Sequence, residues 1–106
     1  MLLAKESLVR IDRLIGVAAA HVQADTKATT KLTAAVEDLR DRSGKVVAGL
    51  TTADDDEVRR SIVELAQLGD LARAAAEADQ AALDYTRQQV IDAHHWIHRL
   101  KQKAVD

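Results

Sequence analysis

The sequence contains no cysteine and no proline, and these two absences narrow the possible folds and functions. Without cysteine there is no disulfide, no thiolate nucleophile and no zinc site of the cysteine type. Without proline, nothing in the chain forces a helix to break. Aromatic residues are also scarce, with no Phe, one Trp and one Tyr. A core therefore has to be built from Ala, Leu, Val and Ile.

Glycine-rich loops, a basic excess and long apolar runs are missing as well. The four glycines are isolated and no motif surrounds any serine, so no phosphate-binding loop or serine triad can be assembled. The net charge of −2 provides no basic excess for general nucleic-acid binding. No segment approaches about eighteen uninterrupted apolar residues. We expect a cytoplasmic protein with no enzymatic activity and no cofactor, and neither nucleic acid nor a membrane as partner.

A repeating apolar pattern dominates the sequence. Residues 8–50 and 58–100 each carry apolar side chains three and four positions apart, which is typical of long helices packed along a narrow seam. The residues expected in the core or interface, with packing as their role, are Ile11, Ile15, Leu32, Val36, Leu39, Ile62, Leu65, Leu83, Val90, Ile97 and Leu100.

The clearest break in this pattern lies between the two stretches. Gly49 can end a helix in a left-handed conformation, and Asp54 with Glu57 has the spacing of a capping box. We predict one all-α domain over residues 1–106, a long antiparallel two-helix hairpin with a helix at about 3–48, a turn at about 49–54 and a helix at about 55–103. Each helix would be about 65 to 70 Å long.

A hairpin of this shape leaves apolar stripes uncovered. Two copies packed face to face would bury them in a four-helix bundle, so we expect a homodimer. An alternative breaks the first helix near Asp25 and the second at Gly69 and Asp70, which gives four shorter helices in a compact bundle. The seam continues across both points without a change of phase, and this continuity favours the two long helices.

Asp25 and Asp79 are charged residues at seam positions, and the hairpin places them at nearly the same height. Polar residues at such positions commonly set the register of packed helices, and this is the role we expect. As an alternative, two neighbouring buried carboxylates can raise one pKa and act as general acid and base, or bind a cation.

Histidines gather near the carboxy terminus. His94 and His98 stand four residues apart, a spacing that lets two imidazoles share a metal, and Asp92 precedes His95 by three. A metalloprotease helix would need a Glu between its histidines and a third ligand, which the sequence lacks. We therefore predict no metal site, and retain His94, His98 and Asp92 as the candidates for one.

The predicted hairpin also brings both termini to one end, and that end is basic. This end would suit an acidic partner or an anionic surface, more so as its histidines protonate. The cations and histidines that would gather there are Lys5, Arg10, Arg13, His94, His95, His98, Arg99, Lys101 and Lys103.

Two helical-hairpin families offer partial resemblances. The run 28–50 is similar in texture to the cytoplasmic hairpins of bacterial chemoreceptors, without their glutamate-rich tip. Length and layout resemble the small secreted WXG-type proteins, which carry Trp-x-Gly in the turn, whereas here the single tryptophan is Trp96. Neither resemblance transfers a functional residue.

The sequence therefore predicts a structural or protein-interaction module that acts through helix packing. One alternative is a small-molecule or metal-binding bundle that uses the end formed by His94, His95 and His98. Another is an accessory regulator of nucleic-acid transactions that uses the basic terminal end.

Overall fold

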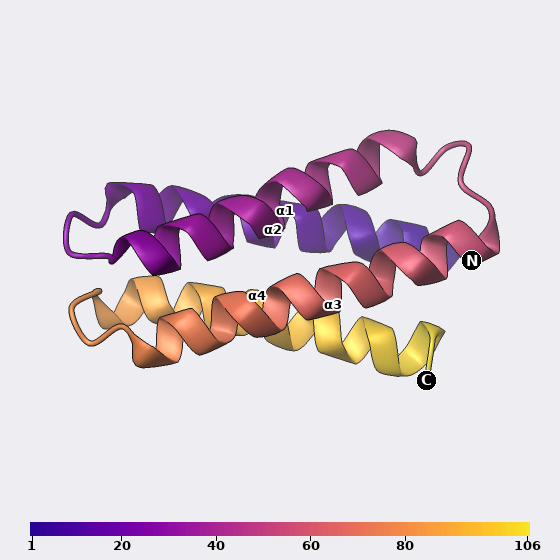
Figure 1. Ribbon diagram of the computed structural model, residues 1–106. Coiled ribbons are helices and arrows are strands. Elements are labelled where there is room, and N and C mark those ends of the chain that lie inside the picture. The colour runs from indigo at the N-terminus through magenta and orange to yellow at the C-terminus, as the bar shows by residue number, and fades with distance from the viewer.

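The computed structural model describes all 106 residues and contains four helices and no strand. The helices are α1 (Leu2–Ala24), α2 (Thr30–Gly49), α3 (Asp55–Ala78) and α4 (Asp84–Ala104). They run alternately up and down the bundle (Figure 1), and each packs against two neighbours, α1 and α3 both contacting α2 and α4. The chain is therefore an all-α, compact four-helix bundle.

The prediction of two long helices was wrong, because each expected helix folds back on itself. The chain turns at Asp25–Thr29 and again at Asp79–Leu83, so the molecule measures 41 × 24 × 17 Å and has no dimension of about 65 to 70 Å. Asp25 has an extended backbone with φ −84° and ψ 101°, and Thr29 starts α2 by accepting a hydrogen bond from the Leu32 N–H at 3.3 Å. Both residues favour helix ends over helix interiors because their side chains bond to nearby backbone amides.

The alternative with four shorter helices is correct about the break near Asp25 and wrong about the second break. Helix α3 continues through Gly69 and Asp70 and ends at Ala78. Gly69 is buried where α4 comes close, and a Cβ atom placed there would lie 3.3 Å from Ile97 Cδ1. This glycine therefore accommodates a neighbouring helix and does not end its own.

The turn between α2 and α3 lies where the sequence predicted it, over 50–54. Its start differs from the expectation, because Gly49 is not left-handed and no residue in the chain has a positive φ. Instead, the N–H of Leu50 donates to Val47 and the N–H of Ala53 donates to Leu50, so the helix passes into a further tight turn. The Asp54 carboxylate then accepts from the Glu57 N–H at 2.8 Å and starts α3.

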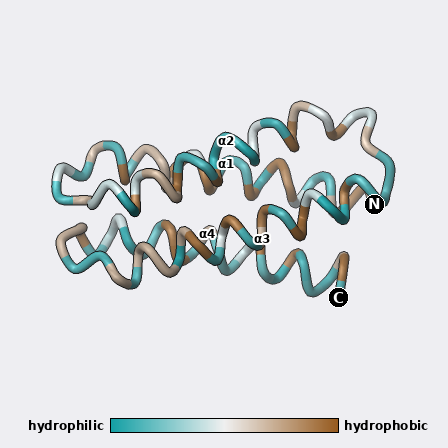
Figure 2. Tube along the Cα trace, in the orientation of Figure 1, coloured by the Kyte–Doolittle hydropathy of each residue, from teal (hydrophilic) through white to brown (hydrophobic).

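The core lies along the axis of the bundle, where the apolar stripes of all four helices meet. Figure 2 shows hydrophobic and hydrophilic residues alternating along every helix. Ten of the eleven residues expected in the core are buried, and the exception is Leu83, which is 55 % exposed. Leu83 precedes the first turn of α4 and faces outward, while Thr86 occupies the buried position one turn later.

This arrangement also removes the reason for expecting a dimer. The stripes that a two-helix hairpin would leave open are covered within a single chain, in one cluster of 24 buried apolar residues.

Each helix in the bundle falls short of the combination of length and apolar character that crossing a membrane requires.

Candidate functional site

The two loops at one end of the bundle are fastened to each other by a reciprocal pair of hydrogen bonds. The Leu83 N–H donates to Asp25 Oδ2 at 2.8 Å, and the Thr29 N–H donates to Asp79 Oδ2 at 2.8 Å. Each aspartate also accepts from its own loop, Asp25 from Lys27 at 2.9 Å and Asp79 from Ala81 and Ala82 at 3.0 Å. Both aspartates thus close their own turn and hold the opposite one.

These hydrogen bonds hold both carboxylates in the charged form. The Leu83 N–H is the largest cause that lowers the pKa of Asp25 below the usual 3.8, and the Thr29 N–H does the same for the pKa of Asp79. A general base that works near neutral pH needs a raised pKa, and these groups shift the other way. The hydrogen bonds show that both carboxylates hold the two loops together. This role differs from the expected one, which was to set the register of two long helices.

The histidines at the carboxy-terminal end do not converge on one point. His94 is buried and its Nε2 lies 2.7 Å from Asp70 Oδ1, while its ring stacks on that of His98 with centroids 5.8 Å apart. Asp92 accepts from the Gln88 amide at 2.8 Å. No three metal-binding side chains come together anywhere in the chain.

Hydrogen bonds or ion pairs between side chains join the helices at three of the four boundaries between neighbouring helices. Ser43 donates to Asp12 at 2.7 Å between α2 and α1, Arg42 donates to Glu64 at 2.8 Å between α2 and α3, and His94 meets Asp70 between α4 and α3. The boundary between α1 and α4 has no hydrogen bond or ion pair between its helices; the Asp25 to Leu83 bond joins the loops beyond them. Across this boundary the rings of His21 and Tyr85 meet edge to face, with centroids 4.7 Å apart.

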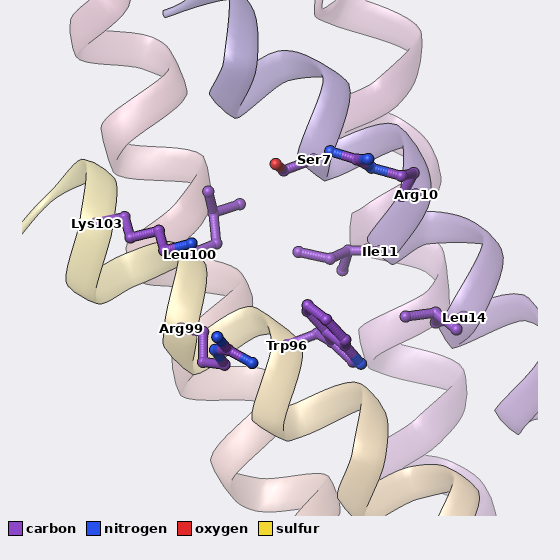
Figure 3. A pocket seen from close by; sticks show the side chains of 8 residues that line it. All are labelled: Ser7, Arg10, Ile11, Leu14, Trp96, Arg99, Leu100 and Lys103. Carbon is purple, nitrogen blue, oxygen red and sulfur yellow. The ribbon is translucent and has the colours of Figure 1, made fainter.

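A pocket of about 280 Å³ opens along this boundary, near the chain termini. Figure 3 shows Ile11 of α1 and Leu100 of α4 reaching into it, with the ring of Trp96 beside them. Ile11 and Leu100 are buried and form its floor, whereas Trp96 is 49 % exposed. The pocket is therefore an apolar depression with a large aromatic side chain on its edge.

Three cations surround this depression, Arg10 from α1 and Arg99 and Lys103 from α4 (Figure 3). Arg99 lies over the Trp96 ring at 5.2 Å from its centroid, and none of the three takes part in an ion pair within the chain. No acidic residue lines the pocket. Its rim is thus positively charged although the chain as a whole carries a net charge of −2.

Large exposed apolar side chains concentrate beside the same boundary. Of the eight in the chain, Leu14 and Trp96 line the pocket and Tyr85 pairs with His21 across the boundary. Leu3 and Val17 share the three- and four-residue spacing of Leu14 on α1, and the other three are Leu2, Leu71 and Leu83. We call this surface the α1–α4 face; its exposed apolar residues are Leu3, Leu14, Val17, Tyr85 and Trp96.

The structure brings together part of the basic end that the sequence predicted. Both termini do lie at one end of the bundle (Figure 1), and Arg10, Arg99 and Lys103 meet there. Three other expected members have partners outside this group: Lys5 donates to the Ala53 carbonyl at 3.0 Å, Lys101 pairs with Asp106 at 3.6 Å, and His94 meets Asp70 at 2.7 Å.

Sequence reasoning missed the apolar residues of the α1–α4 face because most of them stand one residue before a seam position, as Leu14 does before Ile15 and Trp96 before Ile97. A second series with three- and four-residue spacing runs beside each seam, and its apolar members indicate a second, partly apolar helix face. It comprises Leu3, Ser7, Arg10, Leu14, Val17 and His21 in α1, and Tyr85, Gln89, Asp92, Trp96, Arg99 and Lys103 in α4.

Comparisons of the chain with protein-family models, with curated proteins and with solved structures give no match.

Proposed function

We propose that this protein is an interaction module that binds another protein through the α1–α4 face and catalyses no reaction. The observation that carries the proposal is the gathering of five of the eight large exposed apolar side chains on this one face. Isolated exposed apolar residues are normal on any protein, whereas a group of them on one face marks a surface that binds something.

The composition of the face fits a protein partner. Trp96 and Tyr85 are 49 % and 61 % exposed, and these two residue types carry much of the binding energy in protein interfaces. Each combines a large apolar area with few rotatable bonds, so ordering it costs little entropy. Arg99 stacks on Trp96, which adds a third residue type enriched at such contacts.

The shape of the face fits a helix. A groove between two antiparallel helices accepts the ridge of a third helix, whose apolar residues repeat every three or four positions. Tyr85 and Trp96 are eleven residues apart on α4, which is about 16 Å along the axis. That distance corresponds to about three turns of a docked helix.

Site-specific photo-crosslinking tests this proposal. A benzophenone amino acid is placed at Val17 or Tyr85 on the face, or at Leu71 on α3, and the variants are irradiated in extract of the source cells. We expect the two positions on the face to yield a discrete adduct with the same protein, identified by mass spectrometry, and Leu71 to yield none. Leu71 is a matched control because it is 63 % exposed and apolar.

A second copy of the chain is one protein that the face can bind. Light scattering of the purified protein, with adducts at twice the chain mass, would identify a self-assembling module. Adducts with a different protein would identify an adaptor. Crosslinks that are absent from Val17 and Tyr85, or equally frequent at Leu71, would refute the proposal.

A further inference from the structure

We infer that the pocket at the terminal end of the α1–α4 face binds an acidic amphipathic helix of a partner protein. This inference rests on the proposed function and adds the chemistry of the partner. The partner helix inserts an apolar side chain beside Trp96 and directs carboxylates to Arg10, Arg99 and Lys103.

The charges select acidic residues. Three cations from two helices stand around the apolar floor, none is neutralised within the chain, and no carboxylate lines the pocket. A guanidinium group binds a carboxylate through two parallel hydrogen bonds, and it holds that geometry better than an ammonium group does. Two of the three cations, Arg10 and Arg99, are of this kind.

The spacing of the cations selects a helix. Arg99 and Lys103 are four residues apart on α4 and therefore lie about one turn apart on the same side of it. Acidic residues at positions i and i+4 of a helix lying along α4 have the matching separation. Arg10, on the other side of the groove, faces the opposite flank of the same helix.

The hollow shape disfavours two other anionic partners. A nucleic-acid backbone would leave the apolar floor of Ile11 and Leu100 facing a hydrophilic ligand. A membrane surface would meet the protruding Leu3, Leu14 and Trp96, but it would leave the recessed floor of Ile11 and Leu100, which are only 3 % and 8 % exposed, unfilled. An apolar side chain on a peptide can reach such a floor.

A second copy that packs its own α1–α4 face against this one does not supply the missing charge. On the α1–α4 face the series of residues beside the seams contains one carboxylate, Asp92, and three cations. Asp92 already accepts a hydrogen bond from Gln88. Contact between two such faces would leave the cations without partners.

Fluorescence of Trp96 tests the inference directly, because it is the only tryptophan in the chain. The probe is a synthetic 18-residue helix with leucine along one face and glutamate on both flanks. Two matched peptides carry glutamine or lysine in place of glutamate. We expect the glutamate peptide to shift the emission of Trp96, the glutamine peptide to bind at least about tenfold more weakly, and the lysine peptide not to bind.

Variants of the protein assign the contacts. Arg10→Gln and Lys103→Gln are each expected to weaken binding of the glutamate peptide by about three- to tenfold, and Lys45→Gln on α2 to leave it unchanged. Leu14→Ala is expected to weaken it as well, whereas Leu71→Ala on α3 is not. All five positions lie on helix surfaces, so circular dichroism verifies that the fold is retained.

Three results would overturn the inference. One is equal binding of the glutamate and glutamine peptides, and another is no response of Trp96 to either. The third is a response to phosphatidylglycerol vesicles, or to protein concentration alone, without a response to the glutamate peptide. Any of these would leave the crosslinking test of the proposed function unaffected, because that test reports contact with a protein of any charge.

Discussion

Asp25 and Asp79, 54 positions apart in the sequence, are each bound by a backbone amide of the loop that contains the other. The donors, Thr29 and Leu83, are also 54 positions apart, so the two halves of the chain contribute equivalent parts to the contact. Each half is a helical hairpin, and the contact joins the two hairpins at the end that lies away from the chain termini.

Replacing either aspartate with alanine is expected to lower the melting temperature by several degrees. Each carboxylate satisfies amides in two loops, and a helix end or a turn that loses such a bond is destabilised. The double variant is expected to lose less than the sum of the two single variants, because each single change already loosens the shared contact. Thermal denaturation followed by circular dichroism measures this, with Asp41→Ala on the exposed face of α2 as the control. Strict additivity would contradict the coupling.

The same pair predicts a loss of stability in acid. Hydrogen bonds from Leu83 and Thr29 lower the pKa of Asp25 and of Asp79 below 3.8 in the folded state. A group whose pKa is lowered by folding stabilises the protein above its unfolded pKa, and this contribution is lost as the pH falls through the folded pKa. We expect the urea midpoint to fall at pH values below about 4.

The variants Asp25→Asn and Asp79→Asn keep an acceptor oxygen but cannot titrate. Urea titrations between about pH 6 and pH 3 are expected to show a shallower acid decline for each of them than for the parent protein. An identical decline in all three proteins would show that these two carboxylates do not contribute to it.

Leu39 and Leu83 are expected to respond very differently to truncation. Leu39 is 3 % exposed, so Leu39→Ala should cost about 2 to 5 kcal/mol of unfolding free energy through lost burial and a residual cavity. Leu83 is 55 % exposed, so Leu83→Ala should change the free energy of unfolding by less than about 0.5 kcal/mol. Chemical denaturation measures both changes. A comparable loss of unfolding free energy at the two positions would contradict the exposed position of Leu83 before α4.

Two glycines inside helices are expected to be replaceable with a gain in stability. A Cβ atom at Gly16 or Gly44 would meet nothing within 4 Å, so Gly16→Ala and Gly44→Ala should each stabilise the protein by about 0.5 to 1 kcal/mol through helix propensity. Gly69→Ala should gain less, because its Cβ atom would press on Ile97 Cδ1 at 3.3 Å. Urea denaturation of the three variants measures these changes in the free energy of unfolding. A gain at Gly69 equal to that at Gly16 and Gly44 would contradict the prediction.

The helical class, the α2–α3 turn and most of the core follow from local features of the sequence. Apolar spacing places Ile15, Leu32 and Ile62 on buried stripes whether the helices are long or short, because one helix face is apolar in either case. The Asp54 cap marks the start of α3 for an equally local reason.

The turns at 25–29 and 79–83 do not follow from the apolar spacing, since the seams continue through both loops. Thr26, Thr29 and Thr30 weaken the helix after Asp25, but Ala81 and Ala82 after Asp79 are strong helix formers. The second turn depends on a hydrogen bond from a residue 50 positions away, the Thr29 N–H to Asp79, and local propensity contains no such information. The α1–α4 face likewise exists only once the first and last helices lie side by side.

Because the chain termini and the α2–α3 turn share one end of the bundle, the order of the two hairpins in the sequence is interchangeable. A short linker from Asp106 to Met1, with new ends opened within 50–54, produces a circular permutant in which every helix keeps its neighbours. The loop-to-loop contact at the far end would then hold the two halves in place regardless of which half is synthesised first.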